Sequence, residues 1–184
     1  MLVLASASPR RRALLEAIGA RFEVRASEVE ELSEGDPAEV VVANAVRKAE
    51  AVAATAAGGA VVLGVDTDVA LDGELLGKPR DEAKARAHLA RLSGREHEVL
   101  SGVAVCRDGV LAGTGLARSR VVFAALDSAN VELYIRSGEW RDRAGGYAIQ
   151  GLGSILVDRI DGDLSNVIGL PLRTLAELLP EAFH

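Results

Sequence analysis

Val61-Val62-Leu63-Gly64-Val65-Asp66-Thr67 is a short run of apolar, mostly β-branched residues that leads directly into a carboxylate. Such a run predicts a buried strand with Asp66 at its C-terminal end. Ligands of open α/β sheets bind beyond the carboxyl ends of strands, so Asp66 is a candidate for ligand contact. The alternative is that Asp66 only ends the strand as a turn residue, because Asp is common in turns.

The composition around this stretch predicts one folded domain over residues 1–184. Hydrophobic residues make up 49% and charged residues 26%, which allows a sizeable core. Aromatic residues are only 3%, so we expect an aliphatic core. The net charge of −6 argues against a broad nucleic-acid or anionic-membrane surface, but leaves room for a small basic site that binds a phosphorylated ligand.

The compartment predicted from the sequence is the cytoplasm. Cys106 is the single cysteine, so no disulfide can form within the chain, as is usual in a reducing compartment. The N-terminal residues lack the basic region of a signal peptide, and no apolar run approaches about 18 residues, so we expect no transmembrane helix.

The order of elements expected along the chain is β-α-β-α-β-β-α-β-β-α-β-α, which predicts a mixed sheet. Hairpin turns are expected at Asp72-Gly73 and Asp108-Gly109. Four residues are expected to cap helices: Ser8, Asp36, Asp81 and Ser128. The expected strands are Leu2–Ala5, Phe22–Arg25, 61–67 with a continuation to Leu71, a return near Leu75, Glu98–Cys106, Val110–Ala124 and Ile155–Ile160. The expected helices are Pro9–Ile18, Pro37–Ala57, 82–93, 128–137 and Leu172–Leu179.

Three consecutive arginines, Arg10, Arg11 and Arg12, fall in the first turn of the first expected helix. Cations are disfavoured at the positive end of the helix dipole, unless they and the free N–H groups hold an anion such as phosphate. We expect Arg10 to reach a ligand and Arg12 to point outward. The alternative is a basic turn that only faces solvent.

Two lysines and an acidic loop complete the candidate chemistry. Lys48 lies near an apolar helix face, and either points into a cleft or extends its ammonium to solvent. Lys78 lies on a loop fixed by Pro79, but Gly73 and Gly77 enclose only three residues, so the P-loop pattern fails. Asp66 and a glutamate of the acidic loop at residues 28–31 could hold Mg²⁺ or Mn²⁺ with several waters.

Other chemistries lack support in the sequence. The three histidines are scattered and there is one cysteine, which excludes a zinc site of the Cys/His type. Gly151-Leu152-Gly153 has no third glycine at the required position, which argues against a dinucleotide-binding oxidoreductase, and no nucleophile elbow is present. Carboxylates that bind a hard metal among basic side chains are typical of phosphoryl or nucleotidyl hydrolysis.

Several stretches together resemble one family. They are Ala5-Ser6-Ala7-Ser8-Pro9-Arg10-Arg11, Glu30-Glu31, Arg47-Lys48-Ala49, Gly64-Val65-Asp66-Thr67, Gly77-Lys78-Pro79, Leu92-Ser93-Gly94, the run from Ala144 to Gly151, and Gly169-Leu170-Pro171-Leu172. The chain is similar to Maf proteins, nucleoside triphosphate pyrophosphatases with an inosine-triphosphatase-like fold. The resemblance implies an α/β fold with a mixed twisted sheet flanked by helices, two lobes around a cleft, and a homodimer.

The resemblance also implies roles for individual residues. Asp66 matches the proton acceptor, and Glu31 and Asp66 match the metal site. Glu31, Lys48 and Lys78 match further catalytic positions. Substrate binding falls to Ser8, Arg10, Arg11, Thr67 and Gln150, of which Arg10, Thr67 and Gln150 match positions tied to substrate choice.

The Asp-Thr and Tyr-x-Ile-Gln-Gly forms resemble the subgroup that acts on dTTP and UTP. Two alternatives stay open: a pyrophosphatase for 7-methyl-GTP or CTP, and a non-catalytic nucleotide-binding regulator of septum formation. Three residues depart from the family pattern. Asn44 and Asp68 replace residues that are usually apolar, and Ser101 replaces a common Thr. Asp68 either joins the metal site or faces solvent.

Overall fold

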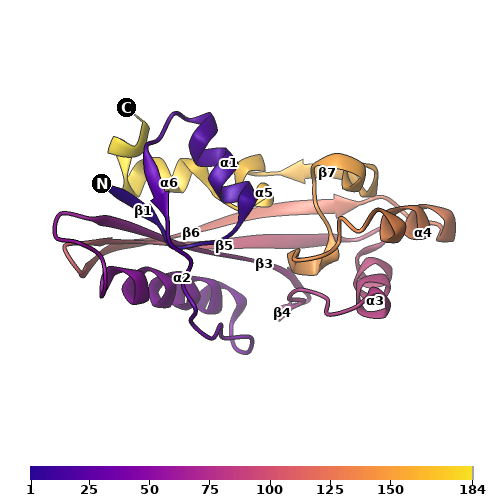
Figure 1. Ribbon diagram of the computed structural model, residues 1–184. Helices are drawn as coiled ribbons and strands as arrows, with labels where there is room; N and C mark the ends of the chain where they lie inside the picture. The colour runs from indigo at the N-terminus through magenta and orange to yellow at the C-terminus, as the bar shows by residue number, and fades with distance from the viewer. Residues whose placement is uncertain (184) are drawn as a thin grey trace.

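The computed structural model describes residues 1–183, which form a seven-stranded mixed sheet with helices on both faces (Figure 1). The strand order is β2-β1-β3-β5-β6-β7, and β4 pairs with the outer part of β3. Strand β1 is parallel to β2 and β3, and the other pairs are antiparallel. The predicted mixed sheet is therefore confirmed. The strands are β1 (Leu2–Leu4), β2 (Phe22–Val24), β3 (Val61–Leu71), β4 (Glu74–Leu75), β5 (Glu96–Arg107), β6 (Val110–Phe123) and β7 (Val157–Asp161).

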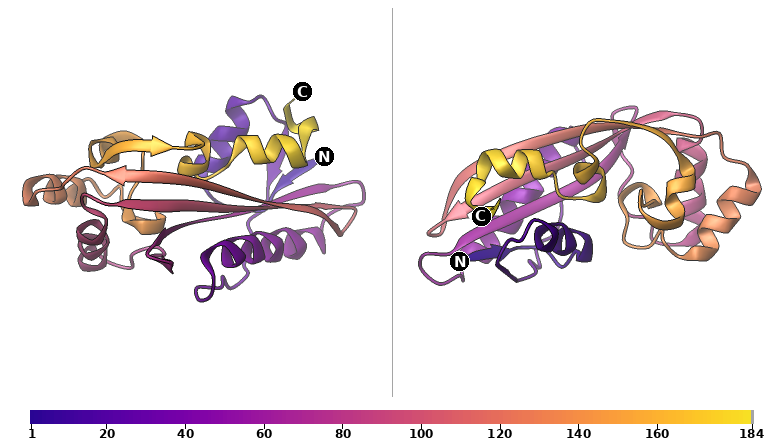
Figure 2. Two further views of the ribbon diagram at one scale, coloured as in Figure 1. Left: turned by 180° about the vertical axis from the view of Figure 1, so that it is seen from behind. Right: turned by 90° about the horizontal axis from the view of Figure 1, so that it is seen from above.

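The helices divide between the two faces and one end of the sheet. The α-helices are α1 (Pro9–Ala17), α2 (Pro37–Ala53), α3 (Glu82–Leu92), α4 (Ser128–Ser137), α5 (Leu164–Ile168) and α6 (Leu172–Leu178). Three short 3₁₀ segments are η1 (Ala144–Gly146), η2 (Gly151–Leu156) and η3 (Pro180–Phe183). Helix α2 covers one face of the sheet and α1 and α6 cover the other, while α3 and α4 lie together at the far end (Figures 1 and 2).

Helix α2 packs unusually close to the sheet because two strand residues beneath it are glycines. A Cβ at Gly64 of β3 would lie 2.2 Å from the carbonyl oxygen of Ala45, and one at Gly102 of β5 would lie 2.2 Å from that of Val41. No real Cβ approaches a backbone atom so closely, so only glycine allows this contact. The short distance brings the polar side chains of α2 within reach of β3.

The prediction that Asp66 ends its strand is wrong. Strand β3 runs on to Leu71, and β5 pairs with it from Val61 to Ala70. What ends near this point is the other neighbour, since β1 pairs with β3 only as far as Leu63. One edge of β3 therefore has no partner strand beside Asp66. The pocket lies along this edge, and not beyond the C-terminal end of a strand as expected.

Three smaller predictions also needed correction, and one short helix was not predicted. Helix α2 ends at Ala53 rather than Ala57, where the chain tightens into i→i+3 bonds such as that from Thr55 N to the Val52 oxygen. Helix α4 is capped by Asp127 rather than Ser128, because the Asp127 carboxylate accepts from Asn130 N. Strand β7 begins two residues late because residues 151–156 form η2, and the short helix α5 was not predicted.

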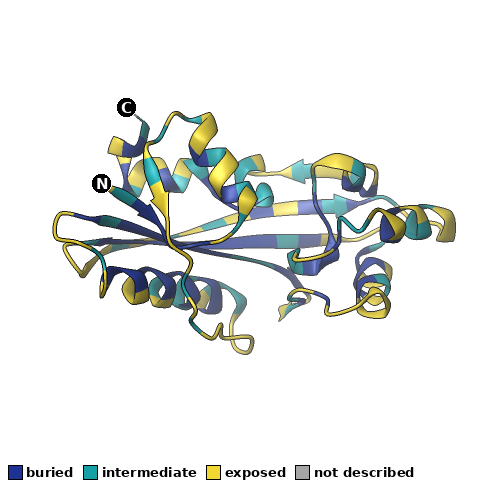
Figure 3. Cartoon of the chain, viewed as in Figure 1, coloured by how far each residue is buried: buried dark blue, intermediate teal, exposed yellow. Residues whose placement is uncertain are grey.

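The core is mainly aliphatic, as predicted, but four of the six aromatic residues are buried together in one region of it. Below α2 and below α1 and α6 the buried residues are Val, Leu and Ala, with Cys106 among them. At the end near α3 and α4, Phe123, Tyr134, Trp140 and Tyr147 are buried together with Leu and Val residues. Figure 3 shows the central strands buried and the outer helix faces exposed. Across residues 1–183, no helix has the length and apolar character needed to span a membrane.

Candidate active site

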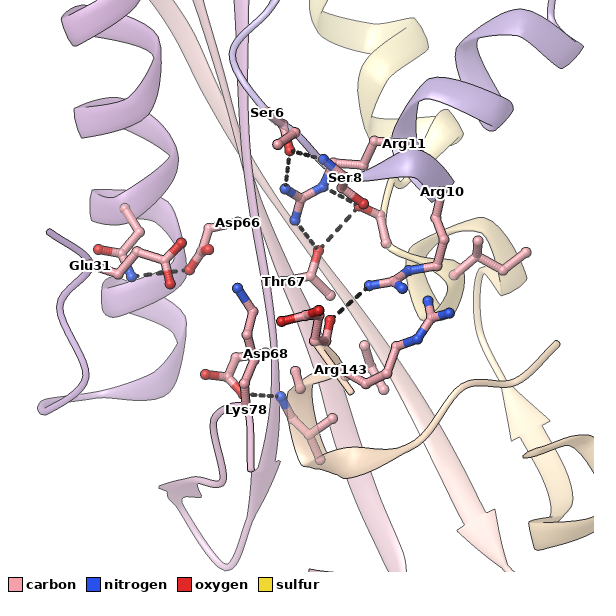
Figure 4. A pocket seen from close by; sticks show the side chains of 18 of the residues that line it. Ser6, Ser8, Arg10, Arg11, Glu31, Asp66, Thr67, Asp68, Lys78 and Arg143 are labelled. Atoms are coloured by element: carbon pink, nitrogen blue, oxygen red, sulfur yellow. Dashed lines mark hydrogen bonds between the residues drawn. The ribbon is translucent and has the colours of Figure 1, made fainter. Parts of the chain in front are cut away.

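A pocket of about 860 Å³ lies along the open edge of β3, between the end of β1 and the start of β4. Its walls come from segments far apart in the chain: the loop before α1, the acidic loop before α2, the Lys78 loop, the loop before η2 and the end of α5. The pocket brings together all nine predicted site residues, which are Ser8, Arg10, Arg11, Glu31, Lys48, Asp66, Thr67, Lys78 and Gln150. Figure 4 shows most of these side chains around a common space.

Lys48 joins the two predicted metal-binding carboxylates. Its ammonium lies 2.6 Å from Oδ1 of Asp66 and 2.6 Å from Oε1 of Glu31. Lys48 is only 7% exposed, so the alternative in which it extends to solvent is wrong. Burial would raise the pKa of Glu31, but the hydrogen bond and charge of Lys48 bring that pKa below its usual value. A buried cation thus holds two carboxylates together at the centre of the site.

Asn44 holds the other oxygen of Asp66. Its side-chain amide donates to Oδ2 of Asp66 at 3.0 Å and to the Leu32 carbonyl at 3.0 Å, and its oxygen accepts from Leu32 N at 2.8 Å. Asp66 is itself only 8% exposed, so both of its carboxylate oxygens are fixed by buried partners from α2. The sequence marked Asn44 only as a departure from the family pattern.

The opposite face of β3 presents Thr67 and a buried arginine. Arg11 donates from Nε to the Gly169 carbonyl at 2.8 Å, from Nη1 to Ser6 Oγ at 2.8 Å and from Nη2 to Thr67 Oγ1 at 3.2 Å. Thr67 Oγ1 also lies 2.8 Å from Ser101 Oγ. Burial lowers the pKa of Arg11, against the opposing effect of the nearby acids.

The three arginines of α1 therefore have different places. Arg12 points away and pairs with Glu16 at 2.8 Å, which confirms the outward prediction. Arg10 lies half-buried at the pocket rim and donates to the Asp142 carbonyl at 3.3 Å. Arg11, rather than the favoured Arg10, is the arginine fixed inside the site. Ser8 occupies the N-cap position as predicted, although its side chain makes no capping hydrogen bond.

Asp68 lines the pocket and binds backbone rather than open solvent. Its Oδ1 accepts from Val69 N at 2.7 Å and from Gly77 N at 3.1 Å, so it anchors the loop that carries Lys78. Burial is the main cause that raises the pKa of Asp68 to about 6. Lys78 itself is exposed and extends into the pocket from this anchored loop (Figure 4).

Arg143 lines the pocket, although no role was predicted for it. It donates from Nε to the Glu139 carbonyl at 3.2 Å, while Nη1 is buried without a partner among the described residues. Burial lowers its pKa. The available signal was an arginine two residues before Gly145-Gly146. Gln150 follows on the same loop, exposed at the rim.

The oxygen donors fit a hard cation that keeps part of its water shell. Glu31 and Asp66 share one ammonium nitrogen, so their carboxylates lie close together. Within residues 1–183, no group of three or more His, Cys, Asp or Glu side chains is arranged to hold a metal. Mg²⁺ is commonly bound by one or two carboxylates, together with substrate phosphates and waters, so two are sufficient.

Comparison with known proteins gives close relatives along the whole chain. A dTTP/UTP pyrophosphatase from Myxococcus xanthus is 49% identical over 99% of this chain and 92% of its own length. One from Deinococcus radiodurans is 48% identical over 97% of this chain and 91% of its own length. Among solved structures, a nucleoside-triphosphatase described as a dITP/XTP pyrophosphatase from Mycobacterium abscessus has 20% identity and a TM-score of 0.47, over 69% of this chain and 76% of that one.

The family model described as Maf-like protein matches residues 1–182, nearly the full length of the chain. That match spans every segment on which the sequence resemblance rested, and all the pocket residues lie within it. The chain belongs to the Maf family.

Proposed function

We propose that this protein hydrolyses dTTP and UTP to the nucleoside monophosphate and pyrophosphate. Relatives at 49% and 48% identity over almost the full chain bear the name dTTP/UTP pyrophosphatase. The observation that carries the proposal is the buried Asp66 carboxylate, held by Lys48 and Asn44 on the wall of the pocket. A pocket of about 860 Å³ also suits a ligand the size of a nucleotide.

Asp66 acts as the proton acceptor for the attacking water. The water oxygen forms a bond to the α-phosphorus, the bond from that phosphorus to the bridging oxygen breaks, and pyrophosphate leaves with that oxygen. One water proton passes to an oxygen of the Asp66 carboxylate. Hydrogen bonds from Lys48 and Asn44 orient that carboxylate before substrate arrives.

Cations on both sides of β3 bind the phosphates. A nucleoside triphosphate has roughly four negative charges, so this acidic protein must concentrate positive charge at the site. Arg11 uses three of its five N–H groups for partners among the described residues, which leaves two for phosphate oxygens. Lys78 and Arg10 approach from the pocket rim, and the α1 N-terminus adds its dipole.

A divalent metal completes the site in this proposal. Glu31 and Asp66 would hold Mg²⁺ or Mn²⁺, because their oxygens are the ligands that such cations prefer. When bound, the metal would neutralise phosphate charge and polarise the phosphoryl oxygen. The buried Lys48 keeps the two carboxylates adjacent, so the protein supplies a preformed pair of oxygen donors.

Gln150 is proposed to recognise the base. Its amide can donate and accept at once, which suits the N3–H and O4 edge of uracil and thymine. Thr67 is proposed to affect substrate choice indirectly. Its hydroxyl is already hydrogen-bonded to Arg11 and Ser101, so it acts by holding Arg11 in place. A single domain over residues 1–184, a homodimer and a cytoplasmic location stay predictions.

The test is pyrophosphate release from dTTP, UTP, CTP, 7-methyl-GTP and the purine triphosphates, with Mg²⁺, with Mn²⁺ and with a chelator. We expect turnover of dTTP and UTP that requires the metal. Asp66→Asn should lower kcat by about 10²–10⁴-fold, the usual contribution of a general base, with an unchanged circular dichroism spectrum. Nucleotide binding without any pyrophosphate release would exclude the proposed enzyme and favour a regulatory protein.

A further inference from the structure

Every hydrogen-bonding group of the Asn44 side chain is engaged. The residue is 2% exposed. Both amide hydrogens and the oxygen are used, by Asp66 Oδ2 and by the backbone N–H and carbonyl of Leu32. A buried amide with all its partners fixes one geometry, because any displacement leaves polar groups unpaired.

Asn44 belongs to one face of α2 that holds the acidic loop. Positions 44, 47 and 48 lie on the same helix face, since side chains three and four residues apart are neighbours. Three contacts connect this face to consecutive loop residues: Asn44 to Leu32, Arg47 Nη2 to the Glu30 carbonyl at 3.1 Å, and Lys48 to Glu31. The loop has no helix or strand of its own, so α2 supplies its order.

Of these three helix residues, two also contact Asp66. Lys48 binds Oδ1 and Asn44 binds Oδ2, so the carboxylate cannot turn about its Cβ–Cγ bond without breaking both bonds. Lys48 can be expected to respond to the charge of bound phosphate or metal. Asn44 is neutral, so its hydrogen bond to Asp66 does not rely on a charge that bound phosphate or metal would neutralise.

We propose that Asn44 is a positioning residue for the hydrolysis: it fixes the orientation of Asp66 and ties the Glu31 loop to the same helix. This inference rests on the proposed function, since it assigns Asp66 the role of proton acceptor. It predicts that loss of Asn44 lowers the rate of the chemical step in folded protein.

The test compares Asn44→Leu, Asn44→Ser and Arg47→Gln with wild type. Leucine removes all three bonds at similar size, while serine adds no charge beside Asp66 and is too short to bond both Leu32 and Asp66. Arg47→Gln is the matched control, because it loosens the loop without contact to Asp66. We expect both Asn44 variants to lose kcat for dTTP by about tenfold or more, as for other partners that orient a catalytic group, with a smaller change in KM. Arg47→Gln should lower kcat less than either Asn44 variant, because it leaves both hydrogen bonds to Asp66 in place.

Loop order has its own readout, which does not depend on activity. A glutamate-specific protease can cleave after Glu28, Glu30, Glu31 and Glu34, and we expect faster cleavage there in Asn44→Leu than in wild type. If Asn44→Leu fails to fold, Asn44→Ser, which adds neither bulk nor charge beside Asp66, still tests the rate.

Two failures can be told apart. Wild-type protein that releases no pyrophosphate refutes the proposed function. An active wild type with Asn44 variants of normal kcat, measured below their melting temperatures, refutes only the role of Asn44. A loss of kcat in Arg47→Gln as large as in Asn44→Leu refutes the proposed orientation of Asp66 by Asn44, because loop order alone would then explain the effect.

Discussion

Two neighbouring residues of β3 serve opposite sides of the same pocket. Asp66 and Thr67 point to opposite faces of the sheet, as successive strand residues must. Asp66 therefore meets α2, and Thr67 meets Arg11 of α1. Because β1 has already ended, the pocket can wrap around the free edge and use both faces. A dipeptide in mid-strand thus connects the carboxylate chemistry to the arginine that is proposed to bind phosphate.

Arg11 and Arg12 offer a matched pair of substitutions in one helix turn. Arg11→Gln should lower kcat/KM for dTTP at least about tenfold, because a charged donor for phosphate is lost. It should also lower the free energy of unfolding by about 2 kcal/mol, since Ser6, Thr67 and the Gly169 carbonyl lose a charged donor. Arg12→Gln should stay within about 0.5 kcal/mol of wild type. Kinetics and urea unfolding check both, and equal effects at the two positions would contradict the different places that the arginines occupy.

Asp68→Asn should stabilise the protein in a pH-dependent way. The pKa of Asp68 rises from 3.8 to about 6 in the folded protein, so the folded state binds the proton more tightly. Its contribution to stability is complete below pH 3.8 and is lost as the pH rises through about 6. Asparagine does not ionise and can still accept from Val69 N and Gly77 N. We expect a gain of about 2 kcal/mol at pH 7.5 that nearly vanishes at pH 4.

The measurement for Asp68→Asn is urea unfolding of wild type and variant in metal-free buffer at both pH values. A gain of equal size at pH 4 and pH 7.5 would show that the carboxyl proton has no part in it.

Residues of the site could be predicted from the sequence where their charge or a family motif distinguished them. Lys48 and Lys78 stood out as cations near glycines or apolar residues, and the motifs gave Asp66 its role. Asn44 did not, because its importance arises from a contact with Asp66, which lies on another element 22 residues later in the chain. Arg143 did not either, because nothing in its local sequence shows that it lines the pocket. Spacing along one helix cannot reveal a partner on another element.

At the scale of elements, local signals predicted more than long-range ones. Both hairpin turns form as expected, with Asp72 and Asp108 in the left-handed conformation and glycine after each. Asp36 and Asp81 cap their helices as expected. That β3 runs unbroken through Asp66 was not predictable in this way, because it depends on pairing with β5, whose partner residues lie 28 to 46 positions later along the chain.

The close packing of α2 on β3, which brings Lys48 to Asp66, depends on Gly64. An alanine Cβ there would lie 2.2 Å from the Ala45 oxygen and 2.8 Å from Ala49 N, so Gly64→Ala must push α2 away from β3. We expect the free energy of unfolding to fall by about 3 kcal/mol. Activity of the folded variant should fall too, since α2 carries Lys48. Gly58→Ala is the control: nothing lies within 4 Å of its added Cβ, and its stability should change by less than about 1 kcal/mol.

Thermal unfolding and pyrophosphate release check the Gly64 prediction together. A Gly64→Ala variant that is as stable and as active as Gly58→Ala would show that α2 does not need its close approach to the sheet.

At the scale of the whole molecule, the pocket is assembled from the first residues of the chain to Gly169. The N-terminal loop, α2, β3 and the loops at Lys78 and Arg143 each supply one wall, and hydrogen bonds join them, such as that from Gly145 N to the Gly77 carbonyl at 2.8 Å. A ligand that contacts several walls at once binds only the folded chain. Ligand binding should therefore stabilise the whole protein, and the size of the effect follows from mass action.

The predicted stabilisation is best measured with Asp66→Asn, which should bind dTTP with little turnover. At a free dTTP concentration 100 times its Kd, binding adds about 2.7 kcal/mol to the free energy of unfolding. For a chain of 184 residues each kcal/mol corresponds to about 2–4 °C, so Tm should rise by roughly 5–11 °C. Differential scanning fluorimetry across a dTTP titration with Mg²⁺ gives both Kd and the shift.

The double variant with Arg11→Gln should need a higher dTTP concentration for the same shift in Tm, because a phosphate contact is missing. A Tm that does not move at millimolar dTTP, or that moves equally with dATP, would contradict a pocket built for a pyrimidine triphosphate with a carbonyl at position 4.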